Sequence, residues 1–195
     1  MTNQASFLIR KAALRADPLN TNYIYWPAFT SRYGTKVISG NNKFIVNSAF
    51  DQLKALGQEI CVQITASTAR FPIVDANDWT NRWELWQHYY AQAYYLGSRY
   101  DVQRYQMYNE PNVDINTTDY LLRLQLASDA VQSAIADVNH LYGKSLTPLV
   151  LAPVTSGSAD GSFSGLGSLV VANRHVNQFG VTDTNFWLLQ KYDYH

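Results

Sequence analysis

The chain has 195 residues, no net formal charge and only 15% charged residues, which is enough length for one domain with a sizeable core. The sequence carries no basic stripe and no apolar run long enough to cross a bilayer, so nucleic acid and membranes are not expected partners. Its first residues also lack the basic and apolar regions of a signal peptide. The single cysteine, Cys61, excludes an internal disulfide, and its place in an alternating run predicts a buried, unreactive thiol.

Aromatic residues are abundant, at 14% of the chain, with fourteen Tyr and five Trp. Aromatic faces with polar edges suit sugar rings, whose C–H groups pack flat on them while hydroxyls bond nearby polar groups. Most of these rings are nevertheless expected to serve ordinary core and helix packing.

The first forty residues are hard to interpret. They favour a strand over Ser6–Leu14 and an aromatic loop or strand over Tyr23–Phe29. Hydrophobic periodicity then predicts helices over 44–56, 79–97 and 117–143, and strands over 60–65, 102–108, 149–154 and 186–194. For the last range, a helix over 185–190 is the alternative. The expected caps are Gly57 and Gly143 at helix ends, and Asp78 and either Thr117 or Thr118 at helix starts.

Because helices separate the strands, the sheet should be parallel, within a single domain that spans residues 1–195. A Gly- and Ser-rich stretch over 155–165 follows a strand but lacks the spacing of a phosphate-binding loop. It is interpreted as a mobile loop at the rim of the sheet.

The segment from Val102 to Asn112 is the most informative one. A strand pattern runs into Asn109-Glu110-Pro111, and Pro111 cannot continue the strand's hydrogen bonding. Glu110 therefore lies at the C-terminal end of a strand, where α/β barrel enzymes hold their catalytic groups. Of the other glutamates, Glu59 precedes a strand and Glu84 is expected to face solvent on a helix. The simplest alternative is an ordinary Glu-Pro turn.

The run Tyr108-Asn109-Glu110-Pro111-Asn112 resembles the end of the fourth strand of clan A glycoside hydrolases, and the Trp-rich helix 79–97 resembles the third helix of their family-39-like members. The resemblance implies an α/β fold that is a partial (β/α)8 TIM barrel, and retaining hydrolysis of a β-linked oligo- or polysaccharide without a cofactor. It implies that Glu110 is the general acid/base and that Asn109 bonds the substrate 2-hydroxyl.

Other substrate-binding positions implied by the resemblance are Tyr194 and His195 at a sixth-strand end, and Arg15 or Arg10 near an early strand. No metal ligand is expected, because His88, His140 and His175 lack the spacing of a zinc site.

The sequence departs from the clan at the nucleophile, a Glu at the end of the seventh strand. A complete barrel needs about 250 residues, so we expect an incomplete catalytic domain whose nucleophile lies beyond His195 and which is inactive alone. Asp193 is not expected to replace it. The full-length enzyme is expected to be secreted or periplasmic. Two alternatives remain: a non-catalytic carbohydrate-binding or degenerate barrel protein, and an unrelated α/β domain in which Glu110-Pro111 is only a turn.

Overall fold

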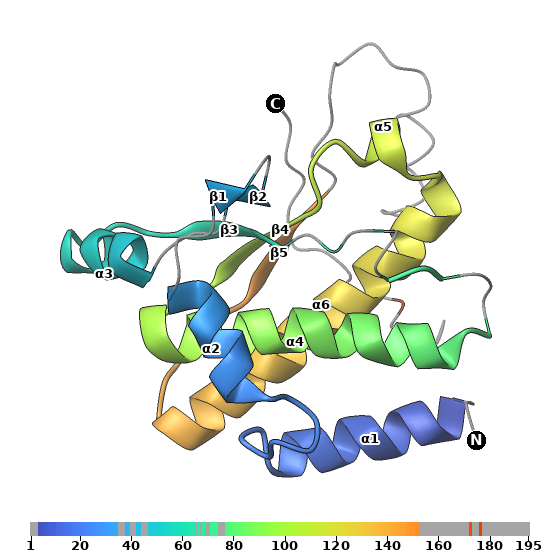
Figure 1. Cartoon of the computed structure of the whole chain (residues 1–195), viewed down its shortest axis with the longest axis horizontal. Coiled ribbons are helices and arrows are strands. Elements are labelled where there is room, and N and C mark those ends of the chain that lie inside the picture. The colour runs from blue at the N-terminus through green and yellow to red at the C-terminus, as the bar shows by residue number, and fades with distance from the viewer. Residues whose placement is uncertain are drawn as a thin grey trace.

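The computed structural model describes residues 4–34, 38–39, 42–43, 47–64, 66, 68, 71–73, 77–152, 172 and 176. Most of these residues lie in helices, and the strands form one two-stranded and one three-stranded sheet (Figure 1). In chain order the elements are α1 (Gln4–Ala16), α2 (Trp26–Gly34), β1 (Ile38–Ser39), β2 (Asn42–Lys43), α3 (Asn47–Ala55), β3 (Cys61–Ile64), α4 (Trp79–Tyr100), β4 (Arg104–Met107), α5 (Pro111–Asp114), α6 (Thr117–Tyr142) and β5 (Leu149–Leu151).

The main sheet has the strand order β3-β4-β5, and both strand pairs are parallel. Val62, Tyr105 and Val150 are aligned across it and are buried, whereas Cys61 on the opposite face of β3 is exposed. Helix α4 connects β3 to β4, and α5 and α6 connect β4 to β5. All three strands therefore end at the same edge, which we call the carboxyl edge; the opposite one is the amino edge.

The described elements form layers. The long helices α4 and α6 pack against each other and lie between the sheet and α1, which contacts both of them (Figure 1). Their contact is close at Gly97, where an added Cβ atom would come within 2.5 Å of the Ile135 Cδ1 atom. A side chain at this position would require the buried Ile135 side chain to shift.

Local capping defines the two long helices. Asp78 accepts a hydrogen bond from the Asn81 amide at 3.2 Å, as predicted, while Asn116 rather than a threonine caps α6 by accepting from the Asp119 amide at 2.9 Å. Gly143 ends α6 in a left-handed conformation, also as predicted. Helix α4 continues past Gly97 and ends at Asp101 with φ of 60°.

A row of stacked rings runs along α4 on its core side. Ring centroids are 5.7 Å apart between Trp83 and Trp86, 5.1 Å between Trp86 and Tyr90, and 5.9 Å between Tyr90 and Tyr94. The Trp86 indole N–H donates to Asp129 Oδ2 on α6 at 2.7 Å. The rings of this row are buried, so they belong to the core rather than to a sugar-binding surface.

The expected partial (β/α)8 TIM barrel is wrong. The described residues are mostly helical, and only three short parallel strands form the main sheet. The strand expected over Ser6–Leu14 lies in helix α1, because its Ala, Leu, Arg and Lys residues favour a helix and because Phe7 and Leu14, two turns apart, are buried on one side. The aromatic segment 23–29 enters helix α2, with Pro27 in the first turn, where proline is tolerated.

Other local predictions are confirmed: the helices α3, α4 and α6 and the strands β3, β4 and β5. Helix α3 and the strands β3 and β4 are shorter than predicted, whereas α4 extends three residues further, to Tyr100. The prediction of a buried thiol at Cys61 is wrong, because the face of β3 that carries Cys61 and Gln63 is exposed. The loop expected over 155–165 and the strand expected over 186–194 lie outside the described residues.

Candidate functional site

The candidate site is the carboxyl edge of the sheet at the end of β4. The Tyr108 amide donates to the Ile64 carbonyl at 3.4 Å and extends the pairing with β3 by one residue. Pro111 then begins α5, and the Val113 amide donates to the Glu110 carbonyl at 3.0 Å. Glu110 is thus the last residue between the strand and the helical turn, and its side chain is half-buried.

The backbone at this edge is strained. Tyr108 has φ of 64° and Glu110 has φ of 48°, both in the left-handed region that disfavours side chains. Each such residue costs about 1–2 kcal/mol relative to a right-handed conformation. The Glu110 side chain makes no capping hydrogen bond to α5, so helix capping does not offset this cost. Backbone strain of this kind is concentrated at functional sites.

A buried polar cluster lies behind Tyr108. Arg123, on the second turn of α6, is 3% exposed and its Nη2 donates to the Phe71 carbonyl at 2.7 Å. In the part of the chain that the structure describes, the Arg123 Nε and Nη1 atoms and the Tyr89 hydroxyl are buried without a hydrogen-bond partner. The Tyr120 hydroxyl donates to the Met107 carbonyl at 3.3 Å. Two of the polar side chains behind the strained edge are therefore incompletely satisfied, which is costly.

Burial sets the ionisation of these phenols. It raises the pKa of Tyr89 far above the ordinary value of a phenol, with the Arg123 guanidinium opposing the shift and Tyr108 adding to it. Burial likewise raises the pKa of Tyr120. Both hydroxyls are therefore protonated near neutral pH and are unsuited to act as bases.

The predicted site residues separate into three groups. Asn109 and Glu110 lie together at the carboxyl edge, Asn109 being exposed. Tyr194 and His195 lie outside the described residues. Arg15 is on α1, where its Nη2 pairs with Asp137 Oδ1 at 2.9 Å.

Arg15 is not brought to Glu110. Asp137 lies 20 residues beyond Thr117, the first residue of α6, which corresponds to about 30 Å along a helix. Glu110 precedes the other end of the same helix. Arg10, the alternative, is exposed on α1 as well. Both arginines were assigned to the site because an N-terminal strand was expected. Residues 4–16 form helix α1 instead, so this reason for the assignment no longer holds.

Sequence reasoning did not find Arg123 or Tyr89. Arg123 follows two leucines in a helix whose apolar face suggested only core packing, so a solvated arginine was the natural interpretation. Tyr89 was one of many aromatic residues on α4. One feature of the sequence could have revealed Arg123. The helix that carries it has apolar residues on all sides, so its polar residues must be partly buried.

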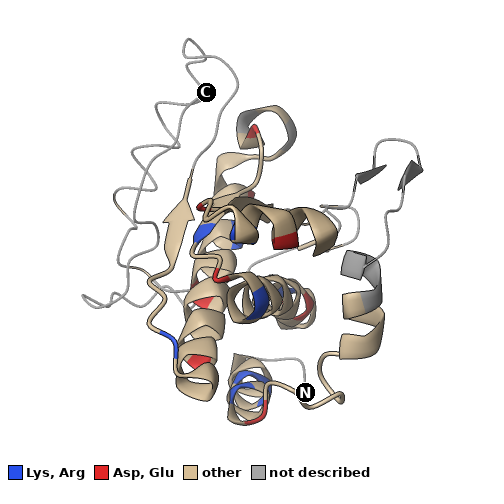
Figure 2. Cartoon of the chain, turned by 90° about the vertical axis from the view of Figure 1, so that its left-hand side faces the viewer, with Lys and Arg blue, Asp and Glu red and all other residues tan. Residues whose placement is uncertain are grey.

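Neither a metal centre nor a membrane span emerges from the described residues. They contain no group of three or more His, Cys, Asp or Glu side chains able to hold a metal ion. The helices among them are all too short or too polar to cross a bilayer. Basic and acidic positions are interspersed on the helices that are visible in Figure 2.

Comparisons with known proteins leave the family open. No protein-family model matches the chain, and neither the curated proteins nor the solved structures contain a significant match to it. The case for a function must therefore be made from the geometry of the carboxyl edge.

Proposed function

We propose that the protein is a retaining glycoside hydrolase acting on a β-linked glycan, with Glu110 as its general acid/base. The observation that supports this most is the pair of left-handed residues, Tyr108 and Glu110, at the end of β4. Glycine would adopt this conformation at no steric cost. The chain instead has a carboxylate at a strained position on the edge where parallel sheets bind ligands.

The chemistry follows from the position of the carboxyl group. Glu110 protonates the glycosidic oxygen as the bond to the leaving group breaks, and later removes a proton from the attacking water. Asn109, next to it and exposed, bonds a substrate hydroxyl. Retention requires a second carboxylate about 5–5.5 Å from the first. That this nucleophile is a Glu beyond His195 remains a prediction.

The test uses the product of the natural gene and aryl β-glycosides. Glu110→Gln should lower kcat/KM about 10²- to 10⁴-fold for substrates with poor leaving groups, because they need protonation. The loss should be much smaller for activated aryl leaving groups. Azide should partly restore the turnover of an activated substrate and yield a β-glycosyl azide, because a small anion attacks without a general base. The 195-residue chain alone should show no significant turnover.

Glu59→Gln is the matched control. Glu59 pairs with Arg104 at the amino edge, so its loss removes a carboxylate of the same type without touching the proposed site. Hydrolysis by Glu110→Gln at the wild-type rate for all leaving groups would contradict the proposal, and would support the interpretation of Glu110-Pro111 as an ordinary turn.

A further inference from the structure

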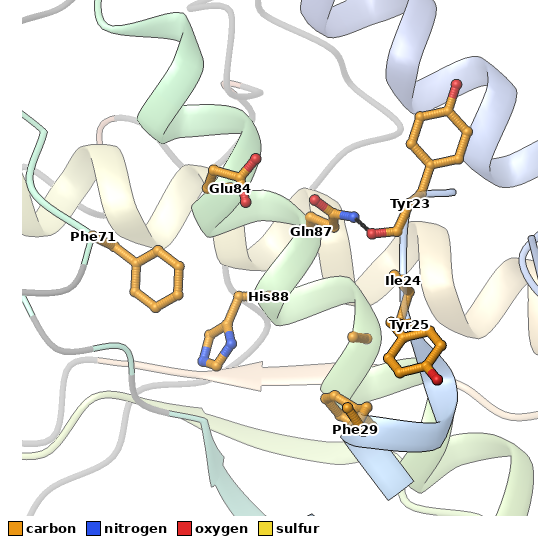
Figure 3. Close-up of a pocket in the computed structure, with 10 residues that line it drawn as sticks. Tyr23, Ile24, Tyr25, Phe29, Phe71, Glu84, Gln87 and His88 are labelled. Atoms are coloured by element: carbon orange, nitrogen blue, oxygen red, sulfur yellow. Dashed lines mark hydrogen bonds between the residues drawn. The ribbon is translucent and has the colours of Figure 1, made fainter. Parts of the chain in front are cut away.

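A hollow of about 310 Å³ lies between α4 and the segment that contains Tyr23 and Tyr25 (Figure 3). One wall is formed by the segment from Tyr23 to Phe29, which includes the first turn of α2. One face of α4 forms the second wall, and Phe71 forms the third. The volume lies within the range of small-molecule sites. Glu110 is not among the lining residues, so this is a separate site.

The lining combines aromatic surface with hydrogen-bonding groups. Tyr25, Phe29 and Phe71 supply rings, and Glu84, Gln87 and His88 supply polar atoms from successive turns of α4. Tyr25 is 64% exposed, which is unusual for a tyrosine in a chain whose other rings are mostly buried. Within the described residues, no hydrogen bond or ion pair involves the Glu84 carboxylate. An exposed ring and an unpaired carboxylate thus face the same hollow.

The walls are held in place independently of any ligand. The Gln87 side-chain amide donates to the Tyr23 carbonyl across the hollow (Figure 3). The Arg123 guanidinium fixes the Phe71 carbonyl at 2.7 Å, and the Phe71 ring lies against His88 with 4.8 Å between centroids. Phe29 is anchored by an edge contact with Tyr95 at 5.7 Å. A site built this way loses little conformational entropy when it binds.

We infer that this hollow binds one pyranose ring of a neutral glycan. The aromatic rings offer flat apolar surface for the C–H face of a sugar. The Glu84 carboxylate and the Gln87 side-chain oxygen accept hydrogen bonds from hydroxyls, and His88 and the Tyr25 hydroxyl add further polar groups. Among the described residues, no Lys or Arg lines the hollow and Glu84 supplies the one carboxylate, which repels anions, so acidic sugars are disfavoured.

This inference extends the proposed function, because a glycan bound here is held on the same chain as Glu110. It does not depend on hydrolysis. The pocket acts as a second contact that increases the effective concentration of a polymeric substrate near the protein.

The test is an NMR titration with cellobiose, a neutral β-linked disaccharide, that follows the ring C–H signals of His88. The chain has four histidines, and His88→Gln assigns the signals by removing them. We expect saturable shifts with a millimolar Kd. Tyr25→Ala should weaken binding about tenfold through loss of the ring. Glu84→Gln should weaken it about fivefold, because a charged acceptor becomes neutral.

Tyr142→Ala is the control, since Tyr142 is an exposed tyrosine outside the hollow, and its affinity for cellobiose should be unchanged. Digalacturonate should bind more weakly than cellobiose. The inference is overturned if cellobiose, xylobiose and mannobiose all leave the His88 signals unshifted, or if binding is insensitive to both pocket substitutions. A saturable response to choline alone would identify an aromatic site for organic cations instead.

Two further results separate this inference from the proposed hydrolase. Glu110→Gln should bind cellobiose at His88 like the wild type. Sugar binding by the product of the natural gene without glycosidase activity would support the pocket and contradict the hydrolase, whereas hydrolysis by that product without any response at His88 would do the reverse.

Discussion

Both edges of the sheet carry residues with a left-handed backbone, but the side chains of these residues have different roles at the two edges. At the amino edge, Asp101 has a left-handed backbone, and its carboxylate binds Lys144 at 2.6 Å and Lys54 at 2.8 Å. The two lysines also donate to carbonyls of the last turn of α4, at Gly97 and Arg99. The left-handed residue is thus a helix cap, and the last carbonyls of the helix are satisfied.

At the carboxyl edge the same backbone conformation occurs twice, at Tyr108 and Glu110, and the Glu110 side chain makes no capping hydrogen bond to the helix that follows. Behind it lie Arg123 and Tyr89, whose side chains carry polar atoms without a hydrogen-bond partner among the described residues. The difference teaches that a left-handed residue is informative only in its context. Where the left-handed residue caps a helix, it contributes to stability, and where it does not act as a side-chain cap, its strain favours a functional role.

The largest expected effect tests the tight packing near the amino edge. Gly97→Ala should lower the free energy of unfolding by up to about 3 kcal/mol, because the new Cβ meets the Ile135 side chain at 2.5 Å. Chemical denaturation measures the loss. Ile135→Val removes the clashing atom, so Gly97→Ala should cost less in that background. Equal costs in both backgrounds would show that this contact does not limit the approach of the helices.

The next prediction compares two neighbouring tyrosines on α4. Tyr90→Phe removes a hydroxyl that donates to Asp137 at 2.9 Å and should cost about 2 kcal/mol of stability, the typical value for a hydrogen bond to a charged group. Tyr89→Phe removes a buried hydroxyl that has no hydrogen-bond partner among the described residues, and should be neutral or slightly stabilising. Thermal unfolding of the two variants distinguishes them. Equal losses would contradict the idea that the carboxyl edge is the less satisfied one.

A smaller effect is expected from relieving the strain. Glu110→Gly should raise the free energy of unfolding by about 0.5–1 kcal/mol, because the left-handed conformation becomes free of steric cost while the unfolded chain gains entropy. Asp101→Gly, the matched change at the amino edge, should instead destabilise, since it removes the partner of two lysines. A destabilised Glu110→Gly protein would argue against stored strain at the carboxyl edge.

The smallest effect concerns pH. Burial raises the pKa of Asp101, but the hydrogen bonds from Lys144 and Lys54 outweigh it and hold the pKa below its ordinary value. A lowered folded-state pKa stabilises above the unfolded pKa, and the gain is lost as pH falls through the folded value, that is, below about pH 4. Asp101→Asn keeps a residue that tolerates the left-handed conformation and should cost less than about 1 kcal/mol at pH 7. The cost should vanish in acid and shrink in high salt.

The parts of the fold that the sequence predicted are those with local signals. Asp78 and Gly143 mark helix boundaries through their own side chain or conformation, and the stripe of α6 is regular over seven turns. The position of Glu110 was equally local, because the strand pattern stops just before it and Pro111 begins the helical turn that follows. These features depend on a few neighbouring residues, so one sequence suffices to find them.

The errors came from long-range packing. Helix α1 is placed by its ion pairs with α6, from Lys11 to Asp129 and from Arg15 to Asp137, which no local pattern announces. The resemblance to a barrel enzyme rested on a short motif and one helix, and extending it to the whole chain gave the wrong fold. Arg123 and Tyr89 escaped notice because their importance lies in partners that only the folded chain brings near.

The stacked row on α4 should also dominate the near-ultraviolet circular dichroism of the protein. Trp83, Trp86, Tyr90 and Tyr94 hold their rings at interplanar angles of 16–22° in a rigid, chiral setting. Chromophores fixed so closely couple electronically, and excitation absorbed by one tyrosine passes readily to a tryptophan. The near-ultraviolet circular dichroism should therefore be intense and should collapse as soon as α4 separates from α6, even while both remain helical.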